Sequence, residues 1–256
     1  MRNALAIAQK ELRAYFASPI AYIVIGFFAL LFGWFYVGIL DWFVRQGMQM
    51  GQFGMGPQNV NVNQQMIRPL LLNMTVVFLF LLPLITMRTY AEEKRSGTIE
   101  LLLTAPLTDW QIVLGKFLGA MALYAAMLAL TLVHFGLLFV FGHPEWKPIA
   151  TAYLGLLLFG GCFISIGLFV SSLTKNQIIA GAATFGVFLL LWVIDWIGQS
   201  LGPNGEAILK YLSMTDHLDD FVKGVIDTKH LVYYLSFIAF GLFLTLRSVD
   251  TERWRG

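Results

Sequence analysis

Residues 70–141 decide the fold. They read LLLNMTVVFLFLLPLITM (70–87), then RTYAEEKRSGTIELLLTAPLTDWQIVLGK (88–116), then FLGAMALYAAMLALTLVHFGLLFVF (117–141). A helix that crosses the hydrocarbon of a membrane needs about 20 mostly apolar residues. The first and last stretches meet that requirement, whereas the charged middle stretch does not. The sequence therefore predicts two membrane crossings joined by a segment that lies outside the bilayer.

The composition extends this prediction to the whole chain. Of the 256 residues, 58% are apolar and 12% are charged, whereas soluble domains carry about 25% charged residues. The apolar runs are continuous rather than alternating, which favours helices over the strands of a membrane barrel. We therefore expect an all-α polytopic membrane protein. The net charge of +2 gives no reason to expect nucleic acid as a partner.

Six runs are long enough to cross, and residues 1–256 form one transmembrane domain around them. The expected spans are 20–40, 70–87, 117–141, 149–173, 178–197 and 231–246. An even number of spans places both termini on one side. Eleven of the seventeen Lys and Arg residues share that side with the termini, and basic residues collect in the cytoplasm. We expect both termini to be cytoplasmic.

The segment before the first span has the pattern of a helix. At 100° per residue, Leu5, Leu12 and Phe16 fall on one arc and the polar residues on the adjoining arc. Pro19 is expected to end this helix. Residues 2–18 therefore predict an amphipathic interfacial helix, with Lys10 and Arg13 directed towards anionic lipid head groups. The alternative is a charged tail that only orients the first span.

Residues 88–116 predict helix–turn–helix–turn–helix on the cytoplasmic face. Gly97 suits a left-handed turn that ends one helix, and Thr98 is expected to cap the next. Pro106 ends the second helix, and Thr108 or Asp109 caps the helix that becomes the third span. An ordinary connection needs about 2–8 residues. The greater length, with charges of both signs, favours docking onto a partner protein over a solvated hairpin.

The segments on the other side differ in character. Residues 41–69 are rich in Gln, Asn, Met and Gly, and we expect a flexible loop without an assigned role. Residues 201–226 alternate apolar and polar positions. Two short helices are expected there, one beginning near Pro203 and one near Asp216, dipping back into the outer leaflet and packing on protein.

Motifs for catalysis, metals or cofactors are missing from the sequence. It has no His-Glu-x-x-His, no Cys-x-x-Cys and no phosphate-binding Gly-x-x-x-x-Gly-Lys-Ser/Thr. His134 and Asp195 are the ionisable residues within the expected spans, whereas ion-coupled carriers usually place such groups at mid-membrane. We expect a chain that is not an enzyme, holds no cofactor and draws its energy from another protein.

Two stretches resemble a known family. Residues 92–116, with Glu-Lys-Arg-Ser-Gly-Thr-Ile-Glu-Leu-Leu-Leu-Thr-Ala-Pro followed by Leu-Gly-Lys, are similar to the first cytoplasmic loop of ABC-2 type transporter permeases. Residues 9–19 resemble the start of the same proteins. Within that group, the permease associated with bacterial gliding motility is the most similar. The resemblance implies an ABC-2, or type V exporter-like, fold in a bacterial inner membrane.

The resemblance also implies partners and contact residues. The working unit would hold two permease chains, identical or paralogous, and two ATPase chains, with membrane lipids around them. Residues 2–18 would be the connecting helix, and 88–104 would hold the coupling helix that enters the ATPase. The residues expected to serve ATPase coupling are Arg88, Glu92, Glu93, Lys94, Arg95, Gly97, Thr98, Glu100 and, as a smaller second contact, Lys175.

The expected function is the permease subunit of an ABC exporter, with the substrate path between two permease chains. The scarcity of polar residues in the spans favours an amphiphilic or lipid-linked substrate without identifying it. Two other classes stay open. An ATP-independent carrier or channel would work without an ATPase, and a membrane anchor for a cytoplasmic complex would use residues 88–116 without a pathway.

Overall fold

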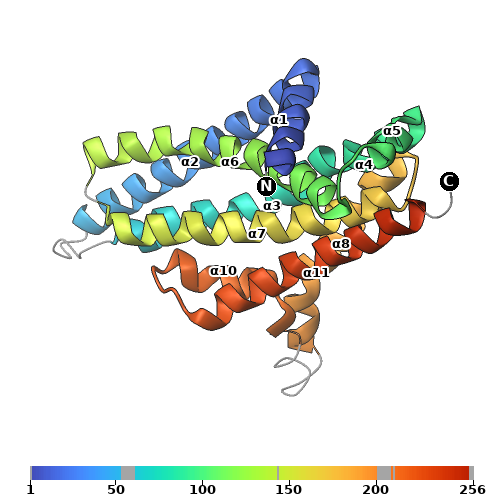
Figure 1. Ribbon diagram of the computed structural model, residues 1–256. Coiled ribbons are helices and arrows are strands. Elements are labelled where there is room, and N and C mark those ends of the chain that lie inside the picture. Colours follow the sequence, from blue (N-terminus) through green and yellow to red (C-terminus); the bar gives the residue numbers. More distant parts are fainter. Residues whose placement is uncertain (1, 53–60, 143, 201–208, 210, 254–256) are drawn as a thin grey trace.

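The computed structural model describes residues 2–52, 61–142, 144–200, 209 and 211–253, and in these ranges the regular structure is helical (Figure 1). The elements are α1 (Arg2–Ala17), α2 (Pro19–Gln52), the π-helix η1 (Asn63–Ile67), α3 (Arg68–Thr86), α4 (Arg88–Ser96), α5 (Thr98–Thr104), α6 (Asp109–Phe141), α7 (Trp146–Ser172), α8 (Gln177–Ser200), α10 (Met214–Val222) and α11 (Thr228–Arg253).

Six helices are long and apolar enough to cross a membrane, which confirms the predicted all-α class with six candidate spans. They are α2, α3, α6, α7, α8 and α11, with α3 and α4 forming one continuous apolar-to-charged stretch. The rest of the chain buries these six helices to different extents. In the most apolar stretch of α3 and of α7, 67% of residues are buried, against 22% for α2 and 17% for α8. The flanks of α2 and α8 are therefore left for lipid or for another chain.

The first two helices meet at Ser18, where the chain changes direction and α1 leaves the bundle at an angle (Figure 1). Pro19 is the first residue of α2, as its missing N–H and fixed φ favour. The predicted end of the N-terminal helix before Pro19 is confirmed.

The expected loop 41–69 is wrong over its first part, because α2 continues to Gln52. An ion pair between Asp41 and Arg45, 2.8 Å apart and one turn apart on the helix, supports this extension. Gln, Met and Arg are also good helix formers. Residues 53–60 lie outside the described ranges, and η1 then leads directly into α3.

One side chain ties η1 to the connection between α6 and α7. Asn63 Nδ2 donates to the carbonyl oxygen of Glu145 at 2.8 Å, and Asn63 Oδ1 accepts from the Glu145 backbone N–H at 2.9 Å. Asn63 is buried, so both hydrogen bonds are shielded from water. The start of α3 and the start of α7 are thereby held together.

The second short helix expected in residues 201–226 is α10, although it begins at Met214 and is capped by Ser213, whose Oγ accepts from the Asp216 N–H at 3.3 Å. The expected first helix, near Pro203, lies outside the described residues. The nine residues of α10 are too few to cross a membrane. This helix packs against the first half of α7, where Gly155 leaves room for Phe221.

Candidate functional site: the face formed by α1, α4 and α5

A glycine turn separates the two short helices that follow α3. Gly97 has φ of +72°, in the left-handed region that glycine adopts without steric cost. The predicted turn at Gly97 is confirmed. The prediction that Thr98 caps α5 is wrong, because Gly97 occupies the cap position and Thr98 Oγ1 instead pairs with Ser96 Oγ at 2.9 Å.

The helix that follows begins with a reciprocal cap. The Thr108 side chain accepts from the Gln111 backbone N–H at 3.4 Å, and the Gln111 side chain accepts from the Thr108 N–H at 3.3 Å. This capping box satisfies two N–H groups that have no partner within the helix. Of the two predicted caps, Thr108 is the one used, and Asp109 is the first residue of α6.

Two glycines on α6 let α1 pack unusually close. A Cβ atom on Gly115 would lie 2.5 Å from Ile7 Cβ, and one on Gly119 would lie 2.7 Å from Glu11 Cβ. The buried face of α1 consists of Ala4, Ile7, Glu11 and Tyr15. The arc identified from sequence is only partly this face: Leu5, on that arc, is 62% exposed. The close packing on Gly115 and Gly119 therefore selects the face that includes Glu11.

Glu11 belongs to a buried ion cluster centred on Lys116. The Lys116 side chain is fully buried, and its Nζ lies 3.0 Å from Glu11 Oε1 and 2.8 Å from Glu93 Oε2. It also donates to the Thr89 carbonyl oxygen at 2.9 Å and lies 5.0 Å from the centre of the Tyr90 ring. One ammonium group thus joins residues of α1, α4 and α6.

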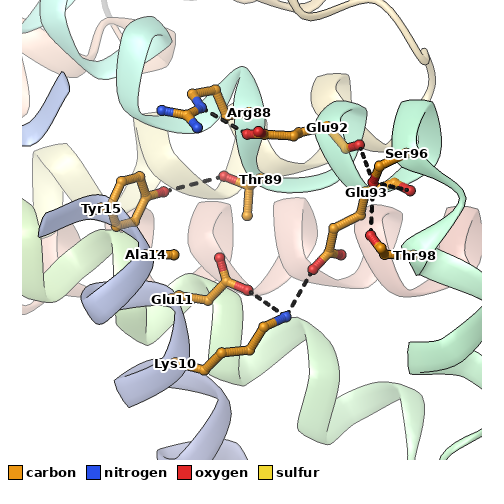
Figure 2. Close-up of a pocket in the computed structure, with 10 residues that line it drawn as sticks. All are labelled: Lys10, Glu11, Ala14, Tyr15, Arg88, Thr89, Glu92, Glu93, Ser96 and Thr98. Carbon is orange, nitrogen blue, oxygen red and sulfur yellow. Dashed lines mark hydrogen bonds and ion pairs between the residues drawn. The ribbon is translucent and has the colours of Figure 1, made fainter. Parts of the chain in front are cut away.

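Lys10 extends the cluster to the surface, where Figure 2 shows it directed at both acidic residues. Its Nζ lies 3.2 Å from Glu93 Oε1 and 3.7 Å from Glu11 Oε1. Burial lowers the pKa of the Lys10 ammonium, but the Glu93 and Glu11 carboxylates outweigh burial, and the net shift of its pKa is upward. Lys10 therefore faces α4 as well as solvent, whereas Arg13 is exposed.

Figure 2 shows the shallow pocket beside this cluster, with a volume of about 350 Å³. On its far side, Arg88 Nε lies 2.8 Å from Glu92 Oε2, and Arg88 Nη1 donates to Ser18 Oγ at 3.2 Å. The Tyr15 hydroxyl donates to the Ile85 carbonyl oxygen at 3.0 Å. The pocket is lined by Lys10, Glu11, Ala14, Tyr15, Arg88, Thr89, Glu92, Glu93, Ser96 and Thr98.

The remaining predicted coupling residues divide into two groups. Lys94 is buried and forms an ion pair with Glu252 near the end of α11. Arg95, Glu100 and Lys175 are exposed. Arg95 of α4 and Lys175, which lies between α7 and α8, line one surface pocket, so two sequence segments predicted as separate contacts lie side by side.

The sequence interpretation missed Glu11 and Lys116, which hold the site together. A signal existed for both. Glu11 follows Ile7 by four residues and precedes Tyr15 by four, so a single charge occupies an otherwise apolar helix stripe. Lys116 follows Gly115 at the start of an apolar run. A lone charge on a buried face usually requires a partner of opposite sign.

Six helices long and apolar enough to cross a membrane, with the charged helix α4 and the short helix α5 between the second and third of them, define a polytopic membrane protein. Comparison of the sequence with protein families matches residues 5–246 to the ABC-2 family transporter proteins, and the chain belongs to this family. ABC-2 permeases are the membrane components of ABC transporters and work with ATP-binding subunits.

Two curated relatives share 32% identity with this chain over 147 residues. Both carry the name "Probable multidrug ABC transporter permease YbhR", one from Escherichia coli strain K12 and one from Escherichia coli O157:H7. The match covers 56% of this chain and 39% of each relative, so the chain spans about two fifths of the length of the curated relatives it matches. This chain is thus homologous to bacterial ABC permeases.

Proposed function

We propose that this chain forms the membrane pathway of an ABC exporter together with a second permease chain, identical or paralogous, in a bacterial inner membrane with both termini in the cytoplasm. A separate ATPase pair supplies the energy. The observation that carries this proposal is the charged helix α4, which continues from α3, turns at Gly97 into α5 and is fixed to α1 and α6 through the buried Lys116. The resemblance of residues 9–19 and 88–117 supports placement near the gliding-motility permeases.

The ATPase contacts the exposed residues of this face. Arg95 and Glu100 on α4 and α5, with Lys175 beside Arg95 and the half-exposed Glu92, present charges of both signs to a partner. Glu93 and Lys94 have a different role in this proposal, because their paired side chains are only 15% and 5% exposed, whereas that of Glu92, paired with Arg88, is 47% exposed. They position α4 rather than bind the ATPase directly.

Force then passes from α4 into the bundle. The Lys116 ammonium attracts Glu93 on α4 and Glu11 on α1, so a displacement of α4 carries α1 with it. α1 is joined to α2 through Ser18, which also accepts a hydrogen bond from Arg88. A nucleotide can shift this arrangement only through contacts that differ between the two states of the ATPase. The exposed charges of α4 and α5 supply those contacts.

The substrate path lies between two permease chains and is lined by α2, α3 and α8. The support is the low coverage of α2 and α8 by the rest of the chain, which leaves large side chains such as Trp34 and Leu190 exposed. Their apolar character fits an amphiphilic or lipid-linked substrate. Residues 201–226 close the outer end, and α1, with Leu5 and Phe16 exposed, contacts lipid at the inner end.

The test is a charge reversal on the exposed face. Glu92→Lys with Glu100→Lys is compared with wild type and with Glu145→Lys, an exposed carboxylate between α6 and α7 at the far end of the bundle. Each chain is affinity-purified from its native membranes, and ATP hydrolysis in the purified material is measured. Wild type and Glu145→Lys should carry ATPase activity, whereas the double variant should lose most of it and remain folded and membrane-inserted.

Two results would contradict the proposal. One is wild-type material that transports substrate without any ATP-hydrolysing chain. The other is a double variant that keeps both its ATPase and ATP-driven export. Glu93 is left unchanged in this experiment, because its reversal would place a positive charge beside Lys116 and disturb the fold itself.

A further inference from the structure

Two histidines face each other at the end of the bundle remote from α4 and α5, where α10 meets the first turn of α11. Nδ1 of His217 and Nδ1 of His230 lie within hydrogen-bond distance. On their other sides, His217 Nε2 lies 2.9 Å from the Tyr211 carbonyl oxygen, and His230 Nε2 lies 2.8 Å from Asp220 Oδ2. Both histidines are buried, each with 5% of its surface exposed.

The hydrogen bonds fix the number of protons on the two rings. A carbonyl oxygen and a carboxylate can only accept, so each Nε2 must carry a proton. The contact between the two Nδ1 atoms needs one further proton, because two bare nitrogen lone pairs would repel. The arrangement therefore requires three ring protons. Two neutral imidazoles carry only two, so one ring must be an imidazolium.

The surroundings identify the charged ring. Burial is the main cause that lowers the pKa of His217; the hydrogen bond to the Tyr211 carbonyl opposes this effect, and the neighbouring His230 lowers the pKa of His217 further. His217 also stacks on Tyr233, with ring centres 3.9 Å apart. His230 instead has a carboxylate partner in Asp220. An imidazolium is favoured beside a carboxylate and disfavoured in an apolar stack.

We infer that His217, His230 and Asp220 form a proton-binding site, in which His230 is an imidazolium that donates to Asp220 and to His217, and that the bound proton fastens α10 to α11. His217 and Asp220 are on α10, and His230 is on α11. Loss of the proton leaves two acceptors facing each other at one of the three contacts. The site is thus intact only while the third proton is bound.

Other charged and titratable groups surround the site, and Asp220 is the carboxylate in direct contact with His230. Lys223 Nζ lies 3.7 Å from Asp220 Oδ1. Asp219, next to Asp220, is engaged by Arg68 of α3 at 2.7 Å. Asp227 and Lys229, which precede His230 in the chain, form an ion pair with each other. The Cys162 thiol of α7 donates to the Tyr234 carbonyl oxygen. The remaining titratable neighbours are Tyr211, Asp216, Tyr233 and Tyr234.

The protonation state can be measured on the full chain in lipid nanodiscs. The chain has four histidines, and replacing His134 and His143 by Gln leaves the two rings of the site. With ¹⁵N-labelled histidine, the NMR spectrum at pH 7 should show three protonated ring nitrogens and one bare nitrogen. The pattern should persist after treatment with EDTA. Two neutral rings at pH 7, or a pattern that changes on metal removal, would overturn the inference.

Two variants test the roles of the neighbours. Asp220→Asn removes the partner of the imidazolium and should lower the midpoint of proton loss by at least one pH unit, a tenfold loss of proton affinity. Asp219→Asn is the matched control, because this adjacent carboxylate binds Arg68 rather than a ring, and it should leave the midpoint in place even if stability falls. Equal shifts in both variants would contradict the assignment.

Hydrogen exchange can measure separately whether the bound proton holds α10 against α11. As the imidazolium signal disappears on raising the pH, amide hydrogen exchange in residues 214–222 should accelerate at least tenfold beyond the intrinsic pH dependence. The same acceleration should be present at all pH values in His217→Phe, which lacks the acceptor. Exchange that shows no step at the titration midpoint would show that the proton does not hold α10.

Discussion

The ammonium group of Lys116 lies 2.8 Å from Glu93 Oε2 and belongs to a side chain with no solvent exposure. Charges are rarely buried without a partner, because the cost of removing them from water is large. Here the pair connects the first turns of α6 with α4, and Glu11 adds α1. The position of the face formed by α1, α4 and α5 therefore depends on one buried positive charge.

Replacing that charge should be severely destabilising. Lys116→Met removes the buried cation between Glu11 and Glu93 and leaves them only the exposed Lys10, and breaking one side of a buried ion pair costs about 3–5 kcal/mol. We expect a marked loss of thermal stability in detergent and faster proteolysis of α1. Lys175→Met, at an exposed lysine, should be close to wild type. Adding Glu11→Gln to Lys116→Met should restore part of the stability, and no restoration would contradict the pairing.

Close packing between α1 and α6 gives a second prediction. In Gly115→Ala the new methyl group would lie 2.5 Å from Ile7 Cβ and 2.9 Å from the Ala4 carbonyl oxygen, so α1 must move away. Overpacking of this kind costs about 1–3 kcal/mol. Gly136→Ala on the same helix meets nothing within 4 Å and serves as the control. Cysteine cross-linking between α1 and α4 should weaken only in the first variant.

The turn between α4 and α5 should be sensitive to backbone conformation alone. A methyl group on Gly97 meets nothing within 4 Å, but φ is +72°, a conformation that costs an L-residue about 1–2 kcal/mol. Gly97→Ala should therefore destabilise this turn and, under the proposed function, reduce the ATPase activity that copurifies with the chain. Gly97→Asn, which tolerates this region better, should lie between Ala and wild type. Equal behaviour of Ala and Asn would contradict the turn.

The ion pair between Lys94 and Glu252 can be tested by swapping the two charges. Lys94→Glu places two carboxylates together at a site where the Lys94 side chain is only 5% exposed, and it should loosen the end of α11 from α4. The double variant Lys94→Glu with Glu252→Lys restores opposite charges and should recover most of the protease resistance of the C-terminal segment. Failure of the double variant to exceed the single variant would exclude a direct pair.

Protonation of His217 in acid, in addition to the proton already on His230, should weaken the packing of α10 on α11. The pKa of His217 is lowered in the folded protein, mainly by burial, whereas the unfolded side chain titrates near 6.5. The unfolded state therefore binds more protons, so this stability contribution is present above pH 6.5 and is lost as the pH falls through the folded pKa. Melting temperatures measured from pH 7.5 to 5 should decline more steeply for wild type than for His217→Gln.

The sequence predicted the class of fold well because membrane insertion imposes a one-dimensional rule. Each span must be long and apolar, so the runs can be counted along the chain. The turn at Gly97 and the break before Pro19 were likewise predictable from the local conformations of these residues. Local rules of this kind explain why the six candidate spans, and the two short helices α4 and α5 between α3 and α6, were predicted from the sequence.

The face formed by α1, α4 and α5 was predicted less completely because its organisation depends on contacts between distant segments. Glu93 and Lys94 are adjacent charges in the sequence, and nothing local shows that one pairs with Lys116 and the other with Glu252. The buried face of α1 also depends on Gly115 and Gly119, about a hundred residues away. The hydrophobic arc of α1 alone does not indicate which of its residues pack against those two glycines.

The double hydrogen bond between Asn63 and the backbone of Glu145 has a mechanical consequence. A side-chain amide that both donates to and accepts from one peptide position opposes sliding of η1 and the start of α3 along α7. At the other end of α3, Ser171 Oγ of α7 donates to the Met87 carbonyl oxygen at 3.0 Å and accepts from the Tyr90 N–H at 3.1 Å. Because α3 and α7 are fastened at both ends, we expect them to travel as one rigid pair when the rest of the bundle rearranges.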